Sequence, residues 1–138
     1  MKITKIDHVA VCVKNIDEAT ATMERVLGIK GVGREYVESQ KTDAVLFPMG
    51  ESNIELISPN GNPGLEKFLE KRGPGLHHVA LEVEGIDRAL VALKELGVRL
   101  IDEEPRKGAR GHRVAFVHPS ATGGLLIELV EPDAHHVG

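Results

Sequence analysis

Two histidines and two glutamates stand at corresponding places in a sequence that repeats itself. Residues 6–13, IDHVAVCV, are matched by residues 76–83, LHHVALEV, so that His8 corresponds to His78. Glu55 and Glu128 each interrupt an apolar run near the end of their copy. Imidazole nitrogens and carboxylate oxygens together suit a divalent first-row metal ion and leave coordination positions for water or substrate. The four residues therefore predict a metal site.

Side-chain alternation puts each of these four residues opposite an aliphatic face. Side chains two apart share one face of a strand, so His8 points away from Val9, and Glu55 points away from Ile54. The second copy follows the same pattern. A buried carboxylate is costly unless it is paired or bound to a metal. Taken singly, each histidine could be a hydrogen-bonded core residue and each glutamate could lie on a solvated face; their recurrence favours the metal site.

Each copy needs a helix and three further strands to hold these residues. The helices are expected to begin near Asp17 and Asp87 and to end at Gly28 and Gly97, which supply the left-handed stop. An apolar stripe runs along each. The β-like stretches that follow are 33–38, 43–47 and 53–57 in the first copy and 98–102, 113–117 and 125–130 in the second.

The sequence therefore predicts an α+β fold made of two tandem βαβββ modules. We expect a single domain over residues 1–138, since this length is typical of one domain. Its expected parts are module one at about 4–58, a connecting helix at about 63–73, module two at about 75–131 and a flexible tail at 132–138.

Composition and charge limit the classes of partner. A formal net charge of −4 and 3% aromatic residues argue against a nucleic-acid binder. The sequence shows neither a signal segment nor an apolar stretch long enough to span a bilayer, so membrane insertion and secretion are not expected. Cys12 is the only cysteine, which excludes an intrachain disulfide and favours a cytoplasmic protein.

Other polar residues carry weaker expectations. The basic stretch 106–113 is either a solvated hairpin tip or an anion-binding loop. His77 has the opposite parity from its neighbour and is expected to support a ligand from behind or to face a helix. His112 and His118 flank a strand and are candidate substrate contacts. His135 and His136 lie in the tail, where they could bind metal adventitiously.

The paired modules, with one metal ligand on the first and last strand of each, resemble the vicinal oxygen chelate superfamily, which includes glyoxalase I, extradiol dioxygenases and fosfomycin-resistance proteins. A narrower resemblance, to the methylmalonyl-CoA epimerase family, rests on residues 68–73, 75–80, 103–109, 114–119 and 122–129. The resemblance to the superfamily covers nearly the whole chain. It implies a half-barrel around a central metal site whose ligands are His8, Glu55, His78 and Glu128.

The resemblance also implies a reaction. It is the metal-dependent epimerisation of (R)- and (S)-methylmalonyl-CoA by 1,1-proton transfer, in which the metal stabilises an enolate and two bases exchange roles. Glu128 matches a family position that is both ligand and proposed base. One divalent ion per chain is expected: cobalt, with nickel, manganese or zinc as alternatives. An acyl-CoA thioester and a second copy of the chain, in a homodimer, are the implied partners.

One departure from the family pattern concerns the second base. Some members carry a second catalytic glutamate where this sequence has Ala44, and those members often have glutamine at the position of Glu55. Our hypothesis is that Glu55 supplies the second carboxylate, ahead of Glu38 or Asp43. The alternative functions are a glyoxalase-I-like isomerase acting on a glutathione hemithioacetal and a non-catalytic binding member of the fold.

Overall fold

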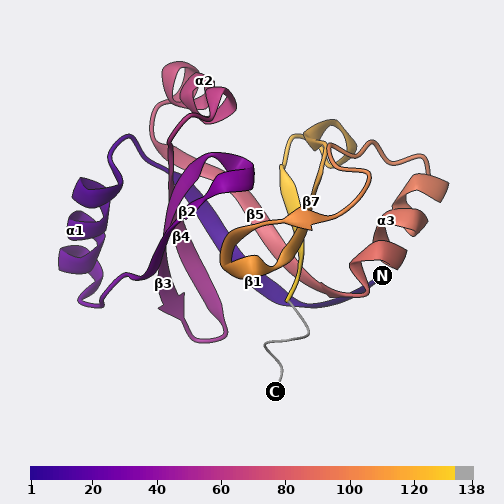
Figure 1. Cartoon of the computed structure of the whole chain (residues 1–138), viewed down its shortest axis with the longest axis horizontal. Helices are drawn as coiled ribbons and strands as arrows, with labels where there is room; N and C mark the ends of the chain where they lie inside the picture. Colours follow the sequence, from indigo (N-terminus) through magenta and orange to yellow (C-terminus); the bar gives the residue numbers. More distant parts are fainter. Residues whose placement is uncertain (133–138) are drawn as a thin grey trace. The chain divides into compact units, whose positions relative to one another are not determined.

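Two units, each with a helix on one face of a β-sheet, make up residues 1–132, the part of the chain described in this computed structural model. The first unit is His8–His77, and the second combines Met1–Asp7 with the chain from His78 onward. Strand β1 (Lys2–Cys12) contributes residues to both units, and so does β5 (Gly75–Glu84). Each unit is described below by itself (Figure 1).

The first unit follows the order strand, helix, three strands, helix. After β1 come α1 (Ile16–Leu27), β2 (Val32–Val37), β3 (Thr42–Met49), β4 (Ser52–Pro59) and α2 (Pro63–Arg72). The strand order is β2-β3-β4-β1. Strand β4 is parallel to β1 and antiparallel to β3, and β3 is antiparallel to β2. The last strand of the unit therefore returns to the side of its first.

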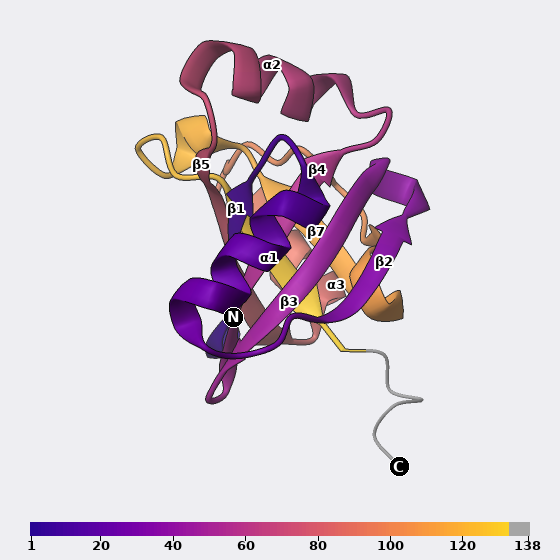
Figure 2. The ribbon, with the colours of Figure 1, turned by 90° about the vertical axis from the view of Figure 1, so that its left-hand side faces the viewer.

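Helix α1 covers one face of this sheet (Figures 1 and 2). Ile16 at its start packs with Val45, Phe47 and Leu56 in one buried cluster, and the partly buried Met23 lies against it. Because strand side chains alternate, the residues between these face the other side of the sheet. We call the side under α1 the helix face and the other the glutamate face, because it carries Glu55.

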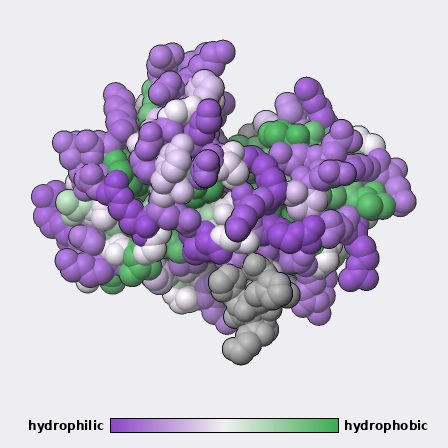
Figure 3. Space-filling model, viewed as in Figure 1, coloured by the Kyte–Doolittle hydropathy of each residue, from purple (hydrophilic) through white to green (hydrophobic). Residues whose placement is uncertain are grey.

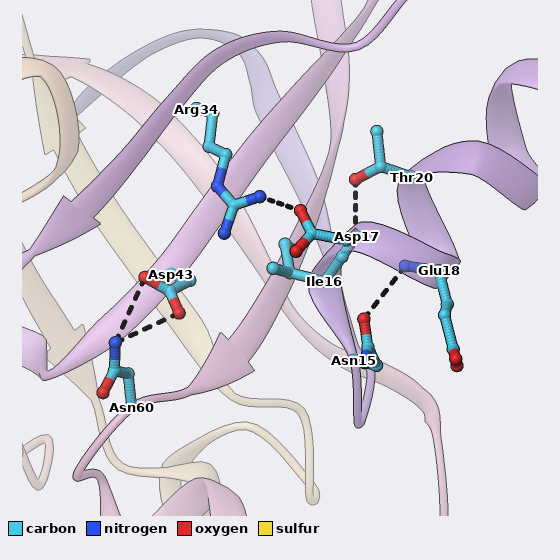
Figure 4. A network of polar contacts seen from close by, with 8 residues as sticks. All are labelled: Asn15, Ile16, Asp17, Glu18, Thr20, Arg34, Asp43 and Asn60. Atoms are coloured by element: carbon cyan, nitrogen blue, oxygen red, sulfur yellow. Dashed lines mark hydrogen bonds and ion pairs between the residues drawn. The ribbon is translucent and has the colours of Figure 1, made fainter.

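The start of α1 differs from the prediction by two residues. The side chain of Asn15, not Asp17, caps the helix by accepting a hydrogen bond from the Glu18 amide at 3.0 Å. Asp17 lies in the first turn and forms an ion pair with Arg34 on β2 (Figure 4). An asparagine oxygen caps a helix as well as an aspartate oxygen, so composition alone could not separate the two.

The second unit repeats this plan. It contains β5, α3 (Ile86–Glu95), β6 (Arg106–Lys107), β7 (Arg113–Val117) and β8 (Ile127–Glu131), ordered β1-β5-β8-β7-β6. Strand β8 is parallel to β5 and antiparallel to β7. Helix α3 packs its Ile86 and Leu90 against Val83 and Leu129, which form the helix face here.

Two predictions about the second unit are wrong. Residues 98–102 form no strand; only Leu100 makes an isolated bridge, to Val117. The Asp102 carboxylate accepts the Phe116 amide at 2.8 Å, so a side chain takes the place of a backbone partner and the ladder cannot continue. Nor does Asp87 cap α3, whose cap is Gly85 in a left-handed conformation. Asp87 instead holds Arg113 with two hydrogen bonds, of 2.8 and 2.9 Å.

The predicted α+β class and the repeated βαβββ order are confirmed. The division into modules within a single domain stays a prediction, and the expected tail falls, beyond Pro132, outside the described residues.

No helix of residues 1–132 has both the length and the apolar character needed to cross a membrane. The face seen in Figure 3 is mostly hydrophilic, with separate apolar patches.

Helix α3 offers a direct test of the helix-face core. Leu90 is 2% exposed and its neighbour Val91 is 53% exposed. We expect Leu90→Ala to lower the free energy of unfolding by about 2–5 kcal/mol, because it leaves a cavity, and Val91→Ala to change it by less than about 0.5 kcal/mol. Urea unfolding followed by circular dichroism measures both. Equal losses in the two variants would contradict this packing.

Candidate functional site

The first unit buries an imidazole beside a carboxylate on its glutamate face. Strands β1 and β4 pair in parallel with Ala10 opposite Glu55, which brings His8 and Glu55 onto the same face two positions apart. His8 Nε2 lies 3.4 Å from Glu55 Oε1, and the two residues are 3% and 5% exposed. Ala10, between them in register, is fully buried and leaves room for both larger side chains.

The second unit repeats this arrangement residue for residue. Strands β5 and β8 pair in parallel with Ala80 opposite Glu128, and His78 Nε2 lies 3.1 Å from Glu128 Oε1. Both residues are 4% exposed. Each unit therefore brings one nitrogen donor and one oxygen donor together in a dry environment.

Such a pair can do two kinds of chemistry. Imidazole and carboxylate are ligands for divalent first-row metals, and a buried carboxylate beside a proton-bearing ring can accept and return a proton. A carboxylate removed from water is stable only with such a partner or with a cation. The burial and spacing of the two pairs agree with the sequence-based expectation, while their role as ligands stays a prediction.

The surroundings of the two pairs differ. Phe116 on β7 lies opposite Glu128, and its ring meets the His78 ring edge to face, with centroids 5.2 Å apart. The equivalent position on β3, opposite Glu55, is Leu46. Sequence reasoning did not single out Phe116, because its place beside Glu128 follows from the register of β7 and β8. The only signal for it was its parity within 113–117.

The carboxylates considered as a second base are held very differently. Ala44 is buried and lies two residues before Leu46, on the glutamate face of β3. Asp43 lies on the other face, where Asn60 Nδ2 donates to both of its carboxylate oxygens at 3.4 and 3.2 Å (Figure 4). Glu38 is exposed in a short 3₁₀ turn. Of the three candidate carboxylates, Glu55 alone is buried beside a histidine.

His77, His118 and the basic stretch have local partners. His77 faces helix α2, as expected: its ring meets that of Phe68 edge-on, at 5.0 Å between centroids. His118 Nδ1 accepts the Ser120 amide at 3.0 Å and so caps a short 3₁₀ turn. In the basic stretch, Arg113 pairs with Asp87 and lowers the pKa of that carboxyl, chiefly through a side-chain hydrogen bond. Both interpretations of this stretch stay predictions.

The sequence is similar to a known protein superfamily and to two relatives over most of its length. Residues 7–116 match the sequence model of the glyoxalase/bleomycin resistance protein/dioxygenase superfamily. The uncharacterised protein YqjC of Bacillus subtilis is 39% identical, covering 97% of this chain and 98% of its own length. The ethylmalonyl-CoA/methylmalonyl-CoA epimerase of Cereibacter sphaeroides is 38% identical, covering 92% and 97%.

A solved structure shows the same likeness in three dimensions. The methylmalonyl-CoA epimerase of Mycobacterium tuberculosis superimposes with a TM-score of 0.91 and 36% sequence identity. The match covers 98% of this chain and 92% of that one. Identity at this level over nearly the full length indicates common ancestry as well as a common fold.

Cys12 provides a chemical probe of the glutamate face of β1. Its side chain is fully buried, and burial raises the pKa of the thiol to about 11. Since the thiolate is the reactive form, a rise of about two pH units from 9.0 lowers its fraction about 100-fold at pH 8. We therefore expect native protein to react with a thiol-specific disulfide reagent at least about 100-fold more slowly than denatured protein. Similar rates would contradict the packing of β1.

Proposed function

Since this chain belongs to the glyoxalase/bleomycin resistance protein/dioxygenase superfamily and, within it, to the methylmalonyl-CoA epimerase family, we propose that it interconverts (R)- and (S)-methylmalonyl-CoA. The observation that carries the proposal is the recurrence of a buried histidine–glutamate pair at the same strand register in both units. Two carboxylates of this kind match a reaction that removes a proton on one face and returns it on the other.

The donor set fits a resident divalent ion. His8, Glu55, His78 and Glu128 would supply two imidazole nitrogens and two carboxylate oxygens, a combination suited to first-row metals. We expect one ion per chain, cobalt first, with nickel, manganese or zinc as alternatives. When bound, the ion would supply Lewis-acid polarisation of the substrate's thioester and carboxylate oxygens.

Glu128 and Glu55 would act as the two proton carriers. The proton to be moved sits on the carbon between the carboxylate and the thioester, and its removal leaves an enolate. One glutamate takes that proton, and the other, protonated, delivers its own from the opposite side. Their burial, 4% and 5% exposed, supports this assignment, because a dry site limits quenching of the enolate by bulk water.

The substrate is proposed as a malonyl-type CoA thioester. The name of the Cereibacter sphaeroides relative includes both ethylmalonyl and methylmalonyl groups. These differ by one methylene, a difference worth only ~1–3 kcal/mol in an apolar pocket. We therefore expect both to react, with methylmalonyl-CoA as the assay substrate of choice. A homodimer acting in the cytoplasm completes the proposal.

The first test is proton exchange at the α-carbon of methylmalonyl-CoA in deuterated water, followed by NMR. We expect exchange with metal-loaded protein, none after chelation, and recovery on adding Co²⁺. Glu128→Gln should lower the exchange rate of the epimer that Glu128 deprotonates at least about 100-fold, the usual scale for losing a positioned acid–base group. Glu131→Gln on the same strand is the matched control, because Glu131 contacts Gly85 and Arg113 and has no histidine partner among the described residues. Absence of exchange with loaded wild type would reject this substrate, and the glutathione hemithioacetal assay would follow.

The second test separates the two glutamates. If Glu55 serves one face and Glu128 the other, Glu55→Gln should lose interconversion of the epimers at least about 100-fold, while one epimer still exchanges its α-proton with solvent. Chiral analysis of the thioester, run beside the exchange measurement, gives both rates. Metal content of the variant must be measured in parallel, because Glu55 is also a proposed ligand. Full epimerase activity in Glu55→Gln would show that the assignment is wrong.

A further inference from the structure

In the second unit, the side chains of Arg106, Phe116 and His78 form a connected stack, which Asp102 supports. The Arg106 guanidinium carbon lies 5.7 Å from the centre of the Phe116 ring, and that ring meets His78 edge to face at 5.2 Å. Asp102 joins the first two members: its Oδ1 lies 3.2 Å from Arg106 Nε, and its Oδ2 accepts the Phe116 amide at 2.8 Å. One carboxylate therefore fixes both the cation and the backbone that carries the ring.

The first unit lacks this stack at the corresponding place. Leu46 stands opposite Glu55, where Phe116 stands opposite Glu128. A leucine offers no ring face and no directional contact to an imidazole. The two histidine–glutamate pairs thus share their register but not their support.

A second stack of the same composition serves as an internal comparison. In the first unit, Arg72 lies 5.8 Å from the centre of the Phe68 ring, and Phe68 meets His77 edge-on at 5.0 Å. His77 precedes His78 in the chain and points to the opposite face of β5. The chain therefore has a second arginine–phenylalanine–histidine stack, and its histidine lies outside the proposed site.

We propose that Asp102, Arg106 and Phe116 are positioning residues that hold the His78 imidazole in one orientation and so set the geometry of the His78–Glu128 pair. The inference rests on the proposed function, since it takes His78 to be a metal ligand. An edge-to-face contact is directional, so the imidazole cannot turn about its Cβ–Cγ bond without losing it. The guanidinium over the Phe116 ring, held by Asp102, restrains that ring in turn.

Restraint of this kind matters most for a ligand. Groups that orient a metal-binding histidine typically change metal affinity about 10–100-fold when they are removed. The same contact on a histidine without that role contributes packing alone. Phe116 and Phe68 should therefore differ in their effect on metal binding even where their effects on stability are alike.

The experiment compares Phe116→Leu, Arg106→Met and Asp102→Asn with the matched variants Phe68→Leu and Arg72→Met. Leucine is the residue that the first unit already tolerates opposite Glu55, and Arg106→Met keeps Phe116 in place. Imidazole order is measured by ¹³C relaxation of His77 and His78 in metal-free protein. Affinity for Co²⁺ is then measured by competition with a chelator, and the Co²⁺ absorption bands report ligand geometry.

We expect Phe116→Leu, Arg106→Met and Asp102→Asn to loosen His78, to shift the Co²⁺ bands and to weaken Co²⁺ binding at least about 10-fold. Phe68→Leu should loosen His77 and leave Co²⁺ binding unchanged. An unaltered His78 in Phe116→Leu, or equal loss of Co²⁺ affinity in Phe68→Leu, would overturn the proposal. Failure of the proposed function would look different: wild type would give no α-proton exchange while the relaxation and Co²⁺ results remained as expected.

Discussion

The two carboxylates buried within residues 1–132, Glu55 and Glu128, each lie beside an imidazole, and the parallel pairing of the first and last strand of each unit provides that neighbour. In both units an alanine faces the glutamate across the strand pair, Ala10 opposite Glu55 and Ala80 opposite Glu128. Any other register would move the acid away from its histidine or, with a shift of one residue, to the other face. The helix faces hold this register in place by packing α1 and α3 on the opposite side.

Duplication explains why the same local solution occurs twice, and divergence explains how its two versions differ. Each unit supplies one nitrogen and one oxygen donor, which alone is a weak basis for holding a metal ion. The proposed metal site would combine both pairs into the mixed donor set that first-row metals accept. Phe116 then separates the two versions, because it adds a directional contact to one pair where Leu46 adds only apolar bulk to the other.

Much of this could be predicted from the sequence because it depends on local periodicity. Alternation along the strands gave the faces of His8 and Glu55, and the internal repeat pointed to their partners. What failed depended on contacts between distant residues. The expected strand at 98–102 is absent because the Asp102 side chain takes the Phe116 amide, and no pattern within the segment reveals that. The contact of Phe116 with His78 likewise required the register of strands that are far apart in sequence.

The strands that flank the two glutamates bear on which residue can be the second base. By register, Ala44 on β3 corresponds to Val114 on β7, each two residues before the side chain that faces a glutamate. Neither is acidic, and Asp43 is turned to the helix face and hydrogen-bonded to Asn60. On the described strands β3 and β7, then, the glutamate face carries no carboxylate. Two further acids share that face by register, Glu35 on β2 opposite Ala44 and Glu82 on β5 two residues after Ala80. Neither is buried, so burial beside a histidine, and not the face alone, distinguishes Glu55 and Glu128 as the candidates for the two bases.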